Sequence, residues 1–205
     1  MAISYPVALP TNINFASIDL RAVNAVAVSR SPFTFSTQVQ NYSGQMWQAD
    51  ASLPPMKRDL AEAWVSTLLS LRGQYGTFYL GDPLNTSVAG LGGDATFLSV
   101  SGSAGDSTVS ILADGTINAG TWFSLGTGIN KRLYKVLQNI TTSPSTAEIY
   151  PALRFGTTLT GGTADLTSAQ GVFRLATNET SWSINEISSY GITLSAVEAL
   201  APYES

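Results

Sequence analysis

The sequence predicts a mainly β protein in which a β-sandwich-like domain carries one α-helix and a small all-β barrel or sandwich module is inserted into that domain. Short segments in which apolar and polar residues alternate, bounded by Gly, Pro, Asn or Asp, run through most of the chain, as is typical of strands. Only residues 55–72 show the period of a helix. The composition becomes rich in Gly, Ser and Ala after this region, and longer alternating strands return near the end. We therefore expect the main domain at residues 1–83 and 152–205 and the inserted module at 84–151.

The segment before the helix is predicted to hold an extended N-terminal arm at residues 1–12, followed by strands at 13–20, 23–28, 33–40 and 46–51. The arm contains two prolines and no apolar period. In the second strand, Val23, Val26 and Val28 do not alternate, which favours a bulge or burial on both faces. Residues 41–44 predict a turn that joins the last two strands into a hairpin.

The helix at residues 55–72 has recognisable ends. Pro55 suits the first turn, where its missing N–H costs nothing, and Gly73 stands where a left-handed C-cap residue is expected. At about 100° per residue, one stripe of the helix is apolar and predicts a set of core anchors. These anchors are Leu60, Trp64, Leu68 and Leu71.

The apolar arc of the helix is wider than packing on one sheet needs, because Val65 and Leu69 extend it to one side. One interpretation is that the helix is simply buried on its own sheet. The other is that Val65 and Leu69 meet a second partner, either another part of the chain or another subunit.

After the helix, a short strand at residues 77–80 ends at the turn Gly81-Asp82-Pro83, where an insertion is sterically easy. The evenly spaced strands that follow predict the inserted module. They lie at residues 95–100, 107–112, 122–125, 133–137 and 147–150. The second part of the main domain is predicted to contribute strands at 171–175, 180–187 and 192–200.

The charge content argues against several classes of partner. Charged residues make up 12% of the 205 residues, about half the usual quarter, and the net charge is −4. The ten Lys and Arg are scattered, so we expect no nucleic-acid binding. No apolar run approaches the length of a membrane span, and no signal peptide is recognisable. Low-charge surfaces of this kind are common in proteins that work within an assembly.

The chain has no His and no Cys, which excludes disulfides, cysteine nucleophiles and every mechanism that uses an imidazole. The acids that stand in Gly- or Ser-rich turns are expected to cap the backbone. These acids are Asp82, Asp94, Asp106, Asp114 and Asp165. No paired-carboxylate, Ser-x-x-Lys or calcium-loop motif occurs. We therefore expect a protein that is not an enzyme, with no catalytic residues, cofactor or metal.

Short motifs in three regions of the chain carry a resemblance to a known class of proteins. In the first part of the main domain, the motifs that carry the resemblance are QAD at 48–50, LPPM at 53–56, AEAW at 61–64 and LRGQYGTFYLGDP at 71–83. In the module they are AGTWFSLG at 119–126, RLYKV at 132–136 and IYPALR at 149–154. Near the end they are GVFRL at 171–175, Trp182, YG at 190–191 and VEAL at 197–200.

With these motifs, the chain resembles tail proteins of long, non-contractile-tailed bacteriophages. The closest functional class is the distal tail protein, a structural virion protein. This resemblance implies a homo-oligomeric ring, usually of six copies, at the tail tip, with tail tube protein on one side and hub and fibre proteins on the other. DNA would pass through the ring only as cargo, and the chain would be made in the host cytoplasm and then reside in the virion. The N-terminal arm, the Val65 and Leu69 side of the helix and open sheet edges would contact neighbouring copies.

Two other classes remain as alternatives at this stage. Trp47, Trp122, Trp182 and the tyrosines could form a sugar-binding platform, which would make the protein a carbohydrate-binding module for attachment to the host surface. A hydrolase of the host envelope is the second. Measuring the mass of the protein in solution separates a ring from both, because a ring is several times heavier than one chain.

Overall fold

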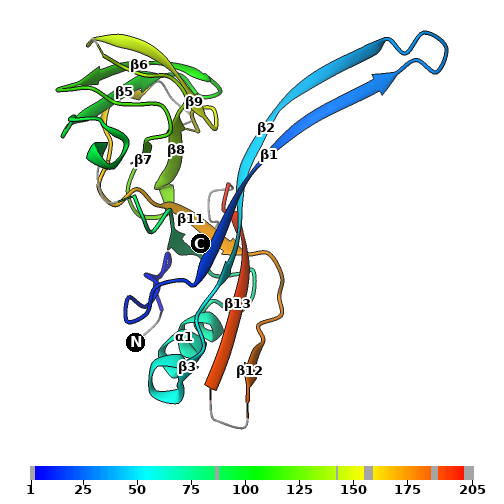
Figure 1. The fold of residues 1–205 in the computed structure, drawn as a ribbon, viewed down its shortest axis with the longest axis vertical. Coiled ribbons are helices and arrows are strands. Elements are labelled where there is room, and N and C mark those ends of the chain that lie inside the picture. The colour runs from blue at the N-terminus through cyan, green and yellow to red at the C-terminus, as the bar shows by residue number, and fades with distance from the viewer. Residues whose placement is uncertain (1–2, 86–87, 142, 155–158, 186–188, 201–205) are drawn as a thin grey trace.

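The computed structural model describes residues 3–85, 88–141, 143–154, 159–185 and 189–200. These residues form two antiparallel sheets and one α-helix (Figure 1), so the predicted mainly β class with a single helix is confirmed. Two short 3-10 helices lie in connections: η1 (Val88–Leu91) is between the first and the second sheet, and η2 (Gly128–Asn130) is between two strands of the second sheet.

The first sheet has seven strands, which come from both ends of the chain. Its main path is β1 (Ser17–Arg30), β2 (Thr37–Ser52), β13 (Ser189–Glu198), β11 (Gly171–Leu175) and β4 (Phe78–Leu80). Two further strands pair with β13, namely β3 (Met56–Lys57) and β12 (Trp182–Ile184). Regions that precede and follow the predicted module thus share one sheet.

The second sheet has six strands in the order β10 (Leu159–Thr163), β5 (Leu98–Gly102), β6 (Thr108–Ala113), β9 (Ser145–Tyr150), β8 (Arg132–Val136) and β7 (Trp122–Leu125). No described strand from residues 84–151 enters the first sheet. However, β10 lies beyond residue 151 and pairs with β5 through Leu159 opposite Gly102. The end of the second sheet therefore differs from the expected module boundary, while the division into separate domains stays a prediction.

Each sheet has its own hydrophobic core. The first core gathers α1 (Arg58–Ser70) with residues of β2, β11 and β13, and includes Trp64 and Phe173. The second core is enclosed by the second sheet and includes Leu98, Phe123 and Tyr134.

The helix begins three residues later than predicted, at Arg58 instead of Pro55. The reason is tertiary: Met56 pairs with Tyr190 and Lys57 with Ser189, so these two residues are extended and extend the sheet. The prediction that Gly73 follows the helix in a left-handed conformation is confirmed, because its φ is +68°. Arg72 before it is also left-handed, with φ +53°.

Three of the four predicted core anchors are confirmed. Trp64, Leu68 and Leu71 are each at most 1% exposed. Leu60 is 37% exposed, so its prediction as a core anchor is wrong. Because the helix starts only at Arg58, Leu60 lies in its first turn, where its carbonyl accepts a hydrogen bond from Asn12 Nδ2 at 3.3 Å.

The region before the helix is one long hairpin and not a series of short strands. The predicted strands at 13–20 and 23–28 merge into β1, and the predicted turn at 41–44 lies inside β2. The chain turns at residues 31–36, where Ser31 N–H donates to the Ser36 carbonyl at 2.9 Å. The predicted bulge is confirmed as a register shift between Asn24 and Val26. Gly44 lies opposite this shift, and the close approach of the strands explains why it is a glycine: a Cβ there would lie 3.0 Å from the Ala25 Cβ.

Replacing Trp64 by Ala should lower the free energy of unfolding by about 3–5 kcal/mol, because it leaves a large hole in the first core. The side chain also stacks edge-on against Phe15 at 5.6 Å and donates from Nε1 to Asn12 Oδ1 at 3.2 Å. The measurement is the denaturant midpoint. Leu69→Ala is the matched control on the same helix, since Leu69 is 54% exposed and its loss should change stability little. Equal midpoints for Trp64→Ala and the wild type would contradict this assignment.

Candidate assembly site: the hairpin arm and its anchor

The outer part of the β1–β2 hairpin projects away from the rest of the molecule (Figure 1). We call residues 25–44 the hairpin arm. The next strand, β13, pairs with β2 only from Gln48 to Ser52, so no third described strand accompanies the arm. Both edges of this two-stranded ribbon therefore have backbone N–H and C=O groups without strand partners.

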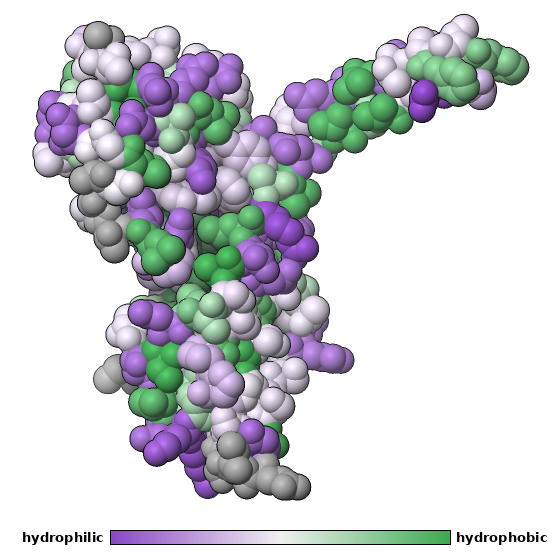
Figure 2. Space-filling view, in the orientation of Figure 1, coloured by the Kyte–Doolittle hydropathy of each residue, from purple (hydrophilic) through white to green (hydrophobic). Residues whose placement is uncertain are grey.

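One face of the hairpin arm carries three exposed valines, with Asn41 opposite Val26 and Thr37 opposite Arg30 on the same face. Ile18 and Leu20 pack against the first core, and by strand alternation Val26 and Val28 continue the same face of β1 outward. Val39 lies opposite Val28 in the ladder. Val28 is 64% and Val39 60% exposed, and Figure 2 shows hydrophobic residues along the arm. The face that is buried at the root of the hairpin is thus uncovered along the arm.

The tip of the arm carries two exposed aromatic side chains. Phe33 is 92% and Phe35 65% exposed. Phe35 has a φ of +55°, a conformation that bulky residues rarely adopt. The Arg30 guanidinium lies over its ring at 4.7 Å from the centroid.

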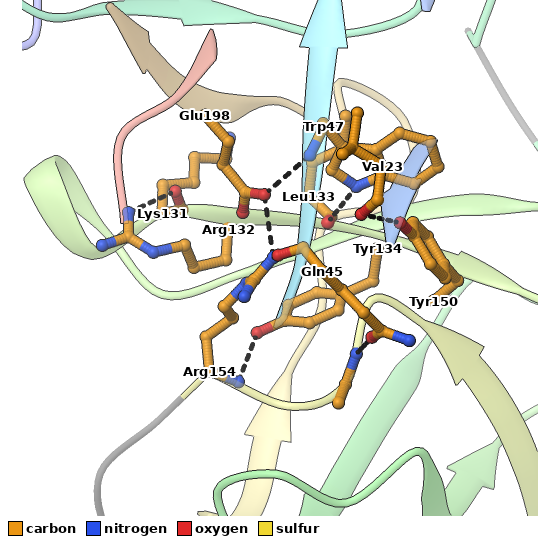
Figure 3. A network of polar contacts seen from close by, with 11 residues as sticks. Val23, Gln45, Trp47, Lys131, Arg132, Leu133, Tyr134, Tyr150, Arg154 and Glu198 are labelled. Carbon is orange, nitrogen blue, oxygen red and sulfur yellow. Dashed lines mark hydrogen bonds and ion pairs between the residues drawn. The ribbon is translucent and has the colours of Figure 1, made fainter. Parts of the chain in front are cut away.

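The root of the arm is held by the second sheet and the residues after it (Figure 3). Tyr150 Oη donates to the Val23 carbonyl at 3.0 Å, and Arg154 Nη2 donates to the Gln45 carbonyl at 2.6 Å. Trp47 Nε1 donates to the Leu133 carbonyl at 3.1 Å, and its ring lies 4.9 Å from that of Tyr150. We call these contacts, together with Glu198, the anchor. They hold β1 and β2 at the point where the arm leaves the molecule.

Glu198 is the buried charge of the anchor. Its Oε2 atom accepts from the Trp47 N–H at 3.0 Å and from Arg154 Nη2 at 2.9 Å. Burial raises the pKa of the Glu198 carboxyl, although Arg154 and the Trp47 N–H oppose this shift. Oε1 of Glu198 and Nε of Arg154 have no hydrogen-bond partner among the described residues. A buried ion pair with unsatisfied polar atoms contributes little net stability, because the cost of desolvating its charges offsets their attraction.

Neighbouring side chains share this low-polarity environment. Burial raises the pKa of Tyr134 to about 12, and its hydroxyl accepts from the Arg154 N–H at 3.1 Å. Burial also lowers the pKa of Arg132, against the attraction of Glu198. Sequence reasoning missed the whole anchor, because its members are far apart in the chain. A buried Arg–Glu pair has no local sequence signal.

The two helix residues predicted for assembly have different environments. Leu69 is exposed and available to a partner. Val65 is buried in the first core of its own chain, so its prediction as a contact with another subunit is corrected.

The predicted N-terminal arm also lies on its own chain, over its described residues 3–12. Tyr5 Oη donates to the Ser70 carbonyl at 2.7 Å. Val7 forms a bridge with Phe78, so this segment covers the outer edge of β4. For residues 3–12 the chain itself therefore provides the surface on which the arm lies, and the expected contact of the arm with neighbouring copies stays a prediction, whereas the outer edge of β1 is open.

Two of the three tryptophans considered for sugar binding are buried. Trp47 and Trp122 each lie in the first core, and the Lys135 ammonium covers the Trp122 ring at 4.3 Å. Trp182 is partly exposed on β12. A stacking platform made of several exposed tryptophans is thus not present among the described residues.

The five turn aspartates all cap backbone N–H groups, as predicted. Asp82 accepts from the N–H of Leu84, Asp94 from that of Thr116, and Asp106 from that of Ser103. Asp114 accepts from the N–H groups of Thr96 and Phe97, and Asp165 from those of Thr167 and Ser168. Within the part of the chain that the structure describes, no three acidic, His or Cys side chains lie close enough together to hold a metal ion.

None of the helices in the described ranges has both the length and the apolar character to cross a membrane. No protein-family model matches the chain, and no curated protein matches it.

Replacing Arg154 by Leu should destabilise the fold by about 3–5 kcal/mol, because it leaves the Glu198 carboxylate buried without its cationic partner. Glu198→Gln should cost less, since it removes the buried charge itself. In the double variant, Glu198→Gln should recover part of the loss caused by Arg154→Leu. Denaturant unfolding of the three variants and the wild type measures this coupling, and additive effects would contradict it.

Asp165 should make stability depend on pH in the acid range. Burial would raise the pKa of its carboxyl, but the Ser168 N–H and hydroxyl and the Lys131 ammonium lower it to about 2. A carboxyl with a lowered folded-state pKa stabilises the fold above its ordinary value of 3.8 and loses that effect as the pH falls towards 2.

The unfolding midpoint of Asp165→Asn should therefore lie below that of the wild type at neutral pH and approach it as the pH falls from about 4 to about 2. Asp106→Asn is the control. Asp106 also caps a turn next to the second sheet, but among the described residues it forms no ion pair with a lysine, whereas Asp165 pairs with Lys131. A constant difference between Asp165→Asn and the wild type over this range would count against the assignment.

Proposed function

We propose that this protein is a structural subunit of a homo-oligomeric ring at the tip of a long, non-contractile phage tail. In this role it joins the tail tube to the hub and fibre proteins and resides in the virion. The single observation that supports the proposal best is the hairpin arm, a long two-stranded ribbon whose apolar face and two edges are uncovered in the isolated chain.

A ribbon of this kind favours a partner for physical reasons. Two strands alone are at best marginally stable in water, and burying apolar surface contributes about 25 cal/mol per Å². A neighbouring copy can cover Val28 and Val39 and can also pair with the open edge of β1. Edge pairing uses backbone groups, so it does not require the charged side chains in which this chain is poor.

A closed ring also needs a constant angle between adjacent copies. Its contacts are heterologous, and the ring closes only if each copy presents its two surfaces in a fixed relation. The anchor supports this requirement, because Arg154, Glu198 and Tyr150 hold the root of the arm against the second sheet. An arm on a loose hinge would give open chains of mixed geometry.

The remaining features agree with a structural role. The resemblance to distal tail proteins suggests six copies around a channel through which DNA passes. A net charge of −4 with scattered Lys and Arg would avoid holding the DNA. Neither catalytic residues nor a cofactor is part of this proposal.

The apolar face of the arm provides the test. Val28→Asp combined with Val39→Asp should abolish or strongly weaken ring formation, while the midpoint of unfolding stays close to that of the wild type, because both residues are exposed in the single chain. Mass in solution, by sedimentation or light scattering, and electron microscopy of assembled tails are the measurements.

Ser29→Asp is the matched control. Ser29 is also exposed on β1, but strand alternation places it on the opposite face of the arm. It should assemble like the wild type. A wild-type protein that stays monomeric both in solution and in tails would refute the ring, and so would an arm variant that assembles normally.

A further inference from the structure

We propose that the aromatic tip of the hairpin arm enters an apolar pocket on the next copy of the chain. The inference rests on the proposed ring and specifies one of its contacts. The tip consists of Phe33 and Phe35, and the pocket lies between the N-terminal segment, α1 and the end of β4.

The pocket has a volume of about 330 Å³. Its lining combines apolar side chains, among them Leu9, Ile13 and Phe15, with polar ones such as Asn14, Asp82 and Ser168. Pockets of this size, lined by aliphatic and aromatic side chains with a few polar groups at the rim, are the usual binding places for small apolar groups. A phenyl ring is a group of that kind.

The tip has the complementary features. Phe33 is almost fully exposed, and Phe35 is held at a positive φ that Gly or Asn adopts more readily. Within their own chain, these two side chains bury little apolar surface, and the contact of Phe35 with Arg30 is the main one that they make. Backbone strain of this type is found most often at functional sites.

The charges of the two surfaces are also complementary. Arg30 stands beside the tip, whereas Asp82 lines the pocket and no Lys or Arg does. Asp82 already accepts from the Leu84 N–H and from Trp122 Nε1. An ionised carboxylate has about four lone-pair sites, so it can still accept from a guanidinium.

The topology separates the two surfaces, as a head-to-tail contact requires. β1 is at one edge of the first sheet and β4 is at the other, with Val7 outside it. Figure 1 shows the arm pointing away from the N-terminal segment that lines the pocket. The tip therefore cannot fill the pocket of its own chain, but one copy offers both halves of a repeating contact.

Because the chain contains no cysteine, disulfide cross-linking can test the contact without background. Thr34 is next to Phe33 at the tip, and Ala8 is exposed at the pocket. Full-length protein with Ala8→Cys and Thr34→Cys should form disulfides between copies on mild oxidation, giving a ladder of oligomers that ends at the ring. The control pairs Thr34→Cys with Thr108→Cys, an exposed position in the second sheet, and should give no ladder.

A second variant tests the energetics. Phe33→Ser should weaken self-association by at least about tenfold, since burying a Phe side chain is worth at least that factor in the equilibrium constant. Its unfolding midpoint should equal that of the wild type, because Phe33 makes little contact with its own chain. Arg30→Glu should also weaken association, and the effect should be larger at low salt.

The outcomes separate this inference from the proposed function. If the wild type forms a ring but the Ala8/Thr34 pair cross-links no better than the control pair, the tip occupies another place and the inference fails alone. Cross-linking by Thr34→Cys without a second cysteine would indicate tip-to-tip pairing and would also overturn it, as would a Phe33→Ser variant that associates like the wild type. A wild type that does not associate at all would remove both the ring and this contact.

Discussion

The carboxylate of Glu198 is buried where β13, the root of the hairpin arm and the segment after the second sheet meet. It binds the Trp47 N–H and the Arg154 guanidinium, and Arg154 also donates to the Gln45 carbonyl. A buried charge of this kind is tolerated only while its partners stay in place. Together with the hydrogen bond from Tyr150 to the Val23 carbonyl, these contacts join the second sheet and β13 to the root of the arm.

The arm itself combines a well-held root with an uncovered outer part. Within the molecule, Ile18 and Leu20 are covered by the first core, whereas Val28 and Val39 face solvent. Apolar surface of this extent on a two-stranded ribbon is unfavourable in water, and a second copy can remove it from water. The low charge of the chain is compatible with the proposed contact between copies, because contacts made by apolar faces and backbone edges need few ion pairs.

Sequence patterns predicted the features that are decided locally. The mainly β class, the bulge near Val26, the burial of Trp64 and the capping role of the turn aspartates all follow from short-range periodicity or turn chemistry. The predicted start of the helix was wrong because Met56 pairs with Tyr190, which is far away in the chain. The anchor was missed for the same reason, since Arg154 and Glu198 acquire their roles only when distant segments meet.

The sequence by itself determined that the chain would be rich in strands, where its one helix would lie, and which face of each strand would be apolar. These properties depend on the alternation and period of neighbouring residues. Tertiary structure alone decided which apolar faces are covered. Leu20 and Val28 stand on the same face of β1, yet β13 pairs with the hairpin only from Gln48 to Ser52, so Leu20 lies over the core while Val28 stands in solvent. The alternation of residues along a strand shows which face is apolar. Whether that face is buried depends on how strands that are distant in the sequence pack against it.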